Sequence, residues 1–380
     1  MSTKKTRADF PALKDWTYLD TAFVGLYPTQ TKQAYEEFVD NWMLFKVKPG
    51  KTILGEWLDK AEKVRRMIAD FINAHRDEIA YTMCTGSGLN VVINGTAWRP
   101  GDNVVFPEWE HNPLDTHTLR RNRVQVRAVK PKDGMIELSD LEKAVDDRTR
   151  LVQLSQVSYV NGFRFNLREV ADLVHAHGAK LLVDSTQAVG AFRIDVAKEG
   201  VDYLSAAPYK YLMGPAGLAF LYVSKENIDA LTPDRVGWKN QLWQGERAEA
   251  PLENMQTAEK IEYGTIHFQG CYGLEKSLEY LNSLGMDTVE HWNHQLSEHC
   301  WNRIHELGAQ MYTPEKTESP IVSFYQKQAT KLSRQLMEQG IKVTGREAHG
   351  GHIRVSTHFY NSKDDVDHFA DRLVIAQKNL

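Results

Sequence analysis

Short apolar segments alternate with longer amphipathic ones along the middle of the chain, between about residues 82 and 223. The apolar runs NVVFP, LVQLS, KLLVDS and LAFLYVS begin at positions 103, 151, 180 and 218 and have the length of strands. Residues 167–180, LREVADLVHAHGAK, carry apolar residues at helical spacing and a glycine near the end. This alternation predicts an α/β fold in which helices cover both faces of a mainly parallel sheet.

The pattern changes after the last of these strands. Residues 234–259 are irregular and rich in Trp, Gln and Glu, which indicates a long connection near a domain or subunit boundary. Further on, helical segments such as LEKSLEYLNSLG (274–285) alternate with short strands such as SPIVSFY (319–325), which predicts a smaller α+β domain. We therefore expect an N-terminal arm over residues 1–20, a large domain over 21–260 and a small domain over 261–380.

Composition and charge narrow the possible partners and compartments. The 380 residues are 42% hydrophobic and 25% charged, which is ordinary for a folded soluble protein, and the net charge of −4 argues against a nucleic-acid partner. No apolar run approaches the roughly twenty residues that a membrane span needs. The polar N-terminus, MSTKKTRADF, lacks the apolar stretch of a secretory signal. Three cysteines without a CxxC pair favour the reducing cytoplasm and argue against a disulfide framework or a thiolate metal site.

Lys210 lies in the unusual segment SAAPYKYLMGPAG, residues 205–217, among small and aromatic residues. A lysine on an exposed turn is one interpretation. The other is a lysine in an apolar pocket, where desolvation lowers the pKa of the amine and makes it a nucleophile.

Asp184 directly follows the apolar run of residues 181–183 in LLVDSTQAVG, at the end of a predicted strand. A buried carboxylate needs a positive or hydrogen-bonding partner. Asp184 could be the N-cap of a following helix. Alternatively, it could pair with a protonated ring nitrogen of a bound cofactor, with Gln187 contacting another polar atom of that ring.

Three other segments add polar residues near predicted strand ends. In MCTGSGLNVVINGTAW, Gly86 and Ser87 open a helix whose N-terminus suits a phosphate, although Ser87 could be an ordinary N-cap. The segment lacks the P-loop and dinucleotide-binding patterns, which disfavours ATP and NAD. His111 follows the NVVFP strand and could stack on a flat cofactor or be structural. Tyr159 lies in the polar run LVQLSQVSYVNGFRFN.

Together these residues describe a site for pyridoxal phosphate. Lys210 would hold the cofactor as a Schiff base, the turn at Gly86 and Ser87 would bind its phosphate, and Asp184 would keep the ring nitrogen protonated. The order of Gly-Ser, His, Asp-x-x-Gln and Lys along one α/β domain is more specific than any member alone.

That set of residues resembles the class V aminotransferase family of fold type I pyridoxal phosphate enzymes, which includes cysteine desulfurases, selenocysteine lyases, kynureninases and isopenicillin N epimerase-like proteins. The resemblance runs from TYLDTA (17–22) to IRVSTHFYN (353–361) and is strongest in VDSTQAVG and PYKYLMGPAG. It implies a large domain with a mainly parallel seven-stranded sheet, a smaller C-terminal α+β domain and a homodimer.

The resemblance also assigns roles to individual residues. It implies that Lys210, His111 and Asp184 are catalytic, with His111 stacked on the cofactor ring. Thr265, in IEYGTIHFQG, would reach the phosphate bound by the neighbouring subunit, and Arg354 would bind the substrate α-carboxylate. The cofactor-binding residues it implies are Gly86, Ser87, His111, Tyr159, Asp184, Gln187, Tyr209, Lys210 and Thr265.

Three departures from the desulfurase pattern bear on the reaction. The residue before Lys210 is Tyr209 where desulfurases often carry histidine, and Tyr159 replaces an asparagine. The segment GREAHGGH, residues 345–352, contains no cysteine that could carry a persulfide. We therefore expect an enzyme that binds an amino acid as an external aldimine and acts as a desulfurase-like or carbon–sulfur β-elimination lyase without a persulfide cysteine. An epimerase or racemase, an aminotransferase, and a non-catalytic binding protein are the alternatives.

Overall fold

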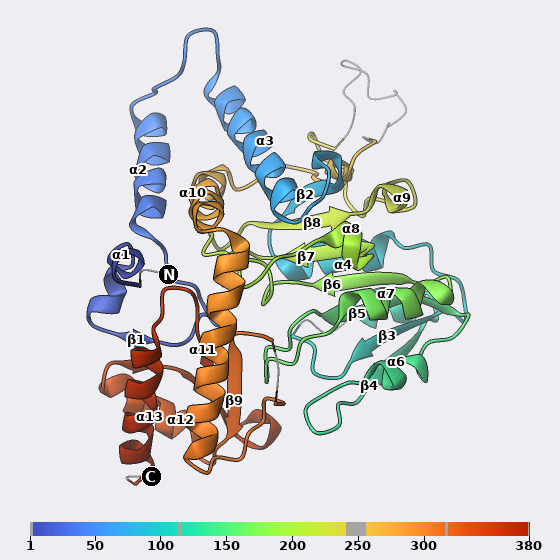
Figure 1. Cartoon of the computed structure of the whole chain (residues 1–380). Helices are drawn as coiled ribbons and strands as arrows, with labels where there is room; N and C mark the ends of the chain where they lie inside the picture. The colour runs from blue at the N-terminus through green and yellow to red at the C-terminus, as the bar shows by residue number, and fades with distance from the viewer. Residues whose placement is uncertain (1–2, 112–115, 241–255, 316–317, 379) are drawn as a thin grey trace, which may run out of the picture.

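A seven-stranded sheet forms the centre of the molecule in the computed structural model, which describes residues 3–111, 116–240, 256–315, 318–378 and 380 (Figure 1). The strand order is β2-β8-β7-β6-β5-β3-β4. Strands β4, β3, β5, β6 and β7 are parallel, whereas β8 is antiparallel to both β7 and β2. The mainly parallel seven-stranded sheet is thus confirmed. Its strands are β2 (Ile79–Thr82), β3 (Asn103–Pro107), β4 (Gln125–Val129), β5 (Thr149–Ser155), β6 (Lys180–Asp184), β7 (Tyr203–Ala206) and β8 (Ala219–Val223).

Helices cover both faces of this sheet. Because successive side chains of a strand point to opposite faces, neighbouring residues of one strand pack against different helices. Val104 and Leu151 pack in a cluster with residues of α4 (Thr85–Gly95). Their neighbours Val105 and Val152 pack in a larger cluster with residues of α3 (Ile53–Phe71), α7 (Leu167–Ala176) and α10 (Phe268–Leu284). Each such side chain contributes about 1.5–3 kcal/mol when it is removed from water. The continuous apolar runs are therefore strands buried on both faces.

The C-terminal part of the chain builds a second layer of structure. Strands β11 (Thr344–Arg346), β12 (His352–Ser356) and β9 (Ile321–Tyr325) form an antiparallel sheet. Residues of this sheet share a separate hydrophobic cluster with residues of α11 (Met286–Glu306), α12 (Ala329–Glu338) and α13 (Lys363–Gln377). Helix α10 instead packs against α3 and α2 (Thr29–Met43). The domain limits at residues 20 and 260 stay a prediction.

The N-terminal segment is attached to the C-terminal part by a short parallel pair, β1 (Thr17–Tyr18) with β10 (Ile341–Lys342). The predicted connection over residues 234–259 lies largely outside the described residues. The remaining helices are α1 (Thr3–Ala8), α5 (Thr116–Arg121), α6 (Leu138–Glu142), α8 (Val196–Glu199) and α9 (Lys225–Ile228), and 3-10 turns lie at Pro11–Lys14, Arg76–Glu78, Ala258–Ile261 and Ala348–Gly350.

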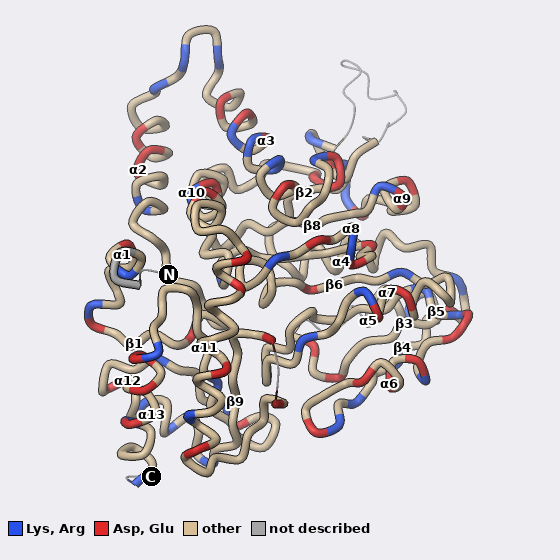
Figure 2. The backbone as a smooth tube through the Cα atoms, viewed as in Figure 1, with Lys and Arg blue, Asp and Glu red and all other residues tan. Residues whose placement is uncertain are grey.

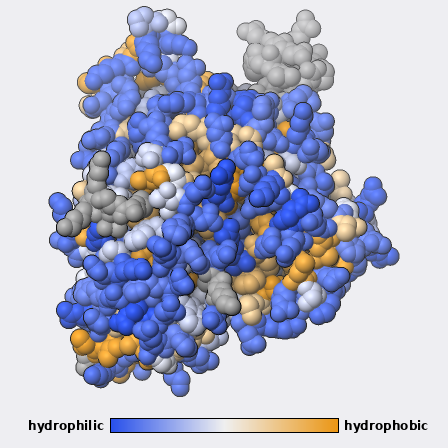
Figure 3. Space-filling model, in the orientation of Figure 1, coloured by the Kyte–Doolittle hydropathy of each residue, from blue (hydrophilic) through white to orange (hydrophobic). Residues whose placement is uncertain are grey.

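The surface carries charges of both signs, and Figure 2 shows them interspersed along the helices and loops. The face seen in Figure 3 is mainly hydrophilic, with hydrophobic residues gathered in smaller areas. Within the described parts of the chain, none of the helices combines the length and the apolar character that a bilayer crossing requires.

Candidate active site

The carboxyl ends of β3, β5, β6 and β7 meet at one edge of the sheet, because these strands are parallel neighbours. Ser155, Asp184 and Ser205 lie side by side in register there. A cavity of about 190 Å³ opens above this edge. Its lining brings together seven of the residues predicted from the sequence, namely Lys210, His111, Asp184, Gly86, Tyr159, Gln187 and Tyr209, with Cys84, Thr85, Ser155, Thr186 and Ala207.

Lys210 lies in the turn that follows β7 and is 6% exposed. Its Nζ lies 5.7 Å from the centroid of the Tyr209 ring. Burial lowers the pKa of the Lys210 amine to about 8, although the charge of Asp184 opposes this shift. The exposed-turn interpretation is therefore excluded, and the amine has the desolvated surroundings of a nucleophilic lysine.

Gly25 allows the N-terminal segment to lie directly against the lysine turn. The Gly25 amide donates to the carbonyl of Tyr209 at 2.8 Å. A Cβ atom at this position would lie 1.9 Å from the carbonyl oxygen of Lys210, which no real structure tolerates. The glycine is therefore needed for a close approach that holds the turn in place.

Asp184 and Gln187 present polar atoms to the cavity from the end of β6. Asp184 is 6% exposed, and its Oδ1 accepts from the Thr186 amide at 3.0 Å. This bond closes a local turn; the next helix along the chain, α8, begins only at Val196, so Asp184 is not a helix cap. Gln187 donates through Nε2 to the carbonyl of Ala22 at 3.0 Å, whereas its buried Oε1 has no hydrogen-bond partner among the described residues. A buried unpaired oxygen at a cavity wall fits a ligand that carries a hydroxyl group.

The N-terminus of α4 closes another side of the cavity. Cys84, Thr85 and Gly86 line it, and the positive end of the helix dipole suits an anionic group such as phosphate. The hydroxyl groups of Thr85 and Thr186 are 2.6 Å apart and both residues face the cavity. Sequence reasoning did not single out either threonine, although Thr186 lies between Asp184 and Gln187. The cavity fits the predicted cofactor, because the N-terminus of α4, the Asp184 carboxylate and the Lys210 amine all line it.

His111 and Tyr159 form the outer wall of the cavity. Their rings meet edge to face with centroids 5.1 Å apart. Glu110, the residue before His111, accepts from both the amide and the hydroxyl of Ser155, at 2.9 and 2.5 Å. Burial raises the pKa of the Glu110 carboxyl to about 8, although the bonds from Ser155 oppose the shift. Glu110 thus links the segment that carries His111 to the end of β5, a role that the sequence did not reveal.

Arg354 lies beside the cavity and does not line it. The side chain is 1% exposed, and its Nη1 donates to the carbonyl of Tyr159 at 2.9 Å. Its Nη2 lies 3.5 Å from Oδ1 of Asp20, which is itself fully buried, whereas Nε has no hydrogen-bond partner among the described residues. Burial lowers the pKa of the Arg354 guanidinium, and Asp20 opposes this. Asp20 is another buried residue of the site that sequence reasoning missed.

Thr265 and Ser87 lie outside this cavity. Both line a different, smaller surface cavity of about 150 Å³, together with Arg235, Tyr263 and His267. Thr265 is exposed, on a segment that joins Ala258–Ile261 to α10. Within this chain, therefore, the predicted phosphate-binding residues are divided between two cavities, with Gly86 in the first and Ser87 and Thr265 in the second.

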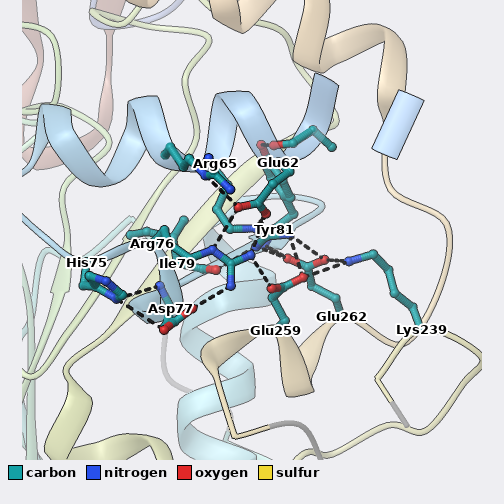
Figure 4. A network of polar contacts seen from close by, with 12 residues as sticks. Glu62, Arg65, His75, Arg76, Asp77, Ile79, Tyr81, Lys239, Glu259 and Glu262 are labelled. Carbon is teal, nitrogen blue, oxygen red and sulfur yellow. Dashed lines mark hydrogen bonds and ion pairs between the residues drawn. The ribbon is translucent and has the colours of Figure 1, made fainter. Parts of the chain in front are cut away.

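A buried ionic network anchors the segment that carries Thr265 (Figure 4). Arg65 donates to both carboxylate oxygens of Glu262, at 2.6 and 3.2 Å, and Lys239 pairs with the same carboxylate. The amide of Tyr81, on β2, also donates to Glu262 at 2.7 Å. Burial alone would raise the pKa of the Glu262 carboxyl, but Arg65 and Lys239 hold it below its ordinary value. The network thus joins α3, β2 and the Thr265 segment.

Comparison with known proteins agrees with this geometry. Residues 17–369 match the family model described as "Aminotransferase class-V". A "Probable cysteine desulfurase" of Methanothermobacter thermautotrophicus is 28% identical over an alignment of 393 residues that covers 98% of both chains. A "Cysteine desulfurase" of Enterobacter sp. is 32% identical over 316 residues, covering 78% of this chain and 76% of the relative. The solved apo structure of a cysteine desulfurase from Thermococcus onnurineus superimposes with a TM-score of 0.90 at 25% identity, covering 99% of this chain and 98% of the other.

The fold and the cavity define the class as fold type I enzymes that use pyridoxal phosphate. Within that class, the chain belongs to the class V aminotransferase family. The resemblance and the fold predicted from the sequence are both confirmed.

Proposed function

We propose that this chain is a pyridoxal-phosphate-dependent enzyme that cleaves the carbon–sulfur bond of cysteine or a closely related amino acid, without a persulfide on its own cysteines. The observation that carries the proposal is the single cavity that unites Lys210, Asp184, Gln187, His111 and the N-terminus of α4. The cysteine desulfurase relatives support the choice of a sulfur amino acid.

Each residue has a chemical role in this proposal. Pyridoxal phosphate supplies an electron sink for the charge that develops at the substrate α-carbon. Asp184 would hold the proton of the ring nitrogen, and Gln187 Oε1 would accept from the ring hydroxyl. Lys210 would anchor the cofactor and then move the substrate α-proton, which an amine with a pKa of about 8 can do near neutral pH.

The substrate and phosphate ends are assigned in the same way. Arg354, whose Nε is buried without a partner, would bind the α-carboxylate, while Asp20 and the Tyr159 carbonyl hold its guanidinium in place. Gly86, with Thr85 and Thr186, would bind the phosphate, whereas Ser87 faces the other cavity with Thr265. His111 would cover the ring, and Tyr209 would take the place of the histidine contact that desulfurases have.

The positions of the three cysteines favour release of sulfur over its capture by the protein. Cys271 and Cys300 are completely buried, and burial raises the pKa of both thiols, that of Cys271 to about 12. Cys84 is exposed and lines the cavity, but it is the N-cap residue of α4, on the side proposed for the phosphate, and its Sγ lies 3.2 Å from the Ser87 hydroxyl. Elimination from cysteine would break the Cβ–S bond and release sulfide, and addition of water would then leave pyruvate and ammonia.

Incubation of the pyridoxal-phosphate-loaded protein with L-cysteine tests this proposal. We expect sulfide and pyruvate in equal amounts, and loss of both in Lys210→Ala. Lys260→Ala is a matched control, because Lys260 is equally buried, 6% exposed, and lies outside the cavity. Alanine in place of pyruvate would indicate desulfuration, solvent deuterium at the α-carbon without net loss would indicate racemisation, and keto-acid-dependent amine exchange would indicate an aminotransferase. No spectral response to any amino acid would favour a binding role.

We further propose a homodimer in which Thr265 of one subunit completes the phosphate site of the other. The proposal is supported by the exposure of Thr265 and by the contacts of Glu262 that anchor its segment to α3 and β2. Mixing of two inactive variants, Lys210→Ala and Thr265→Ala, tests it. Random pairing would create one intact site in half of the dimers, so activity should return to about a quarter of the wild-type value. Absence of any recovery in a verified mixed dimer would refute shared sites.

The cytoplasmic location is also a proposal. It is supported by the three cysteines, all of them free thiols. Localisation of the tagged protein by cell fractionation would test it.

A further inference from the structure

Arg346, the last residue of β11, carries a guanidinium with no role in the reaction described above. The residue is partly buried, and its guanidinium lies 5.1 Å from the centroid of the Tyr159 ring. Within the described part of the chain it has no ion pair and no side-chain hydrogen bond. A partly exposed guanidinium whose described neighbour is an aromatic ring keeps hydrogen-bond donors available for an anionic ligand.

The small sheet places Arg346 and Arg354 on the same side. In the antiparallel pair of β11 and β12, Thr344 lies opposite Arg354 and Arg346 lies opposite His352. Residues that lie opposite each other share a face, as do residues two positions apart along a strand. The two guanidinium groups therefore project from one face of the sheet, the face that meets Tyr159.

Tyr159 connects both arginines to the cavity. Its carbonyl accepts from Arg354, its ring contacts Arg346, and the residue itself lines the cavity beside His111. The charge of Arg346 acts in the same region. Burial is the main reason why the pKa of Lys210 is lowered, and the Arg354 and Arg346 charges add to it. Burial likewise lowers the pKa of His352 to about 4, again with a contribution from Arg346.

The charges around the two arginines are unequal. Asp20 is close to Arg354, at 3.5 Å, and also pairs with Lys342 at 3.3 Å. If the substrate α-carboxylate binds Arg354, as proposed above, Arg346 still lacks an anion.

We propose that Arg346 binds a second anionic group, carried by the substrate side chain. This inference rests on the proposed function, and the corresponding substrate class is cysteine thioethers with a terminal carboxylate. Cleavage of such a thioether would break the Cβ–S bond, release a mercapto acid and, after addition of water, leave pyruvate and ammonia.

Two nearly isosteric ligands separate charge recognition from fit. S-carboxymethyl-L-cysteine ends in a carboxylate, and S-carbamoylmethyl-L-cysteine ends in the corresponding neutral amide. Binding of each to the cofactor-loaded protein is measured from the change in cofactor absorbance. A hydrogen-bonded ion pair predicts that the carboxylate binds about 10- to 100-fold more tightly than the amide. In Arg346→Gln this preference should fall to within about twofold, while the affinity for the amide stays unchanged.

Two further variants make the result specific. Arg346→Lys keeps the charge and should retain part of the preference. Arg334→Gln removes an exposed arginine of α12 that has no ion pair among the described residues, and should behave like the wild type. Equal affinity of the wild type for the two ligands, or an equal loss for both ligands in Arg346→Gln, would overturn the inference while leaving the proposed function intact. A cofactor-loaded protein that responds to no amino acid at all would refute the proposed function and the inference with it.

Discussion

The Glu262 carboxylate is the point at which the buried ionic network is most easily broken. Glu262→Gln keeps the shape of the side chain and removes its charge. Arg65 is 2% exposed and Lys239 is 9% exposed, so both cations would remain buried after their shared partner is lost. Removing one member of a buried ion pair typically costs about 3–5 kcal/mol, because the remaining charge is left uncompensated.

The lower part of that range is expected here, since Glu259 lies 3.1 Å from Arg65 and 3.5 Å from Lys239 and compensates part of the charge. We therefore predict that Glu262→Gln lowers the free energy of unfolding by about 3 kcal/mol. The measurement is urea unfolding followed by far-ultraviolet circular dichroism at neutral pH. Glu279→Gln is the matched control, because its pairs with Lys276 and Lys63 lie at the surface and should contribute less than about 1 kcal/mol.

The pH dependence of the same variant gives an independent check. The pKa of Glu262 is lower in the folded protein than in the unfolded chain. Its stabilisation is therefore present above the ordinary carboxyl pKa of about 4.3 and is lost as the pH falls through and below that value. The difference between wild type and Glu262→Gln should shrink in acid. A cost at neutral pH no larger than that of Glu279→Gln would refute the assigned role of the network.

Three shorter predictions concern the cavity itself. Gly25→Ala should displace the lysine turn and abolish cofactor binding in a spectral titration. Gly55→Ala is the control and should bind the cofactor normally, because the nearest atom to its added Cβ is the Thr52 hydroxyl oxygen at 3.1 Å. Normal cofactor binding by Gly25→Ala would contradict the close approach of Gly25 to the Lys210 carbonyl. The pKa of Glu110 is about 8 in the folded protein, so the folded protein holds the carboxyl proton more tightly than the unfolded chain does. The free energy of unfolding should therefore fall as the pH rises from about 5 to 8. Glu110→Gln should reduce this fall, and an unchanged pH profile would show that Glu110 does not titrate there. Arg354→Ala should retain the cofactor absorbance but lose its spectral response to amino acids. Arg354→Lys is the control that keeps the buried charge. If Arg354→Ala bound amino acids with unchanged affinity, Arg354 could not be the residue that binds the α-carboxylate.

The sequence was most informative for functional residues that come shortly after a buried strand. The runs that precede His111, Tyr159, Asp184 and Lys210 are strands of one parallel sheet, so their ends had to meet at one edge. For His111, Tyr159 and Asp184 this rule was enough to predict a shared site. The strand before Lys210 was not predicted, and the fold type and the role of Tyr209 came from the family resemblance.

Residues paired over long sequence separations were the ones that escaped prediction. The Thr85 and Thr186 hydroxyls belong to different elements, and the Glu110–Ser155 and Asp20–Arg354 contacts likewise join distant segments. Such pairs leave no periodic pattern in the sequence, because each partner is an ordinary polar residue in its own segment. The burial of Glu262 is equally invisible in the sequence, because glutamate is almost never fully buried unless paired and its partners Arg65 and Lys239 come from distant segments.

The most direct measurement traps the cofactor on the protein. Borohydride reduction of the pyridoxal-phosphate-loaded enzyme, followed by digestion and mass spectrometry, locates the lysine that carries the cofactor. We predict one modified peptide, the one that contains Lys210, and its disappearance when a sulfur amino acid is added before reduction. Modification of a different lysine, or of none, would contradict the assignment of the active site.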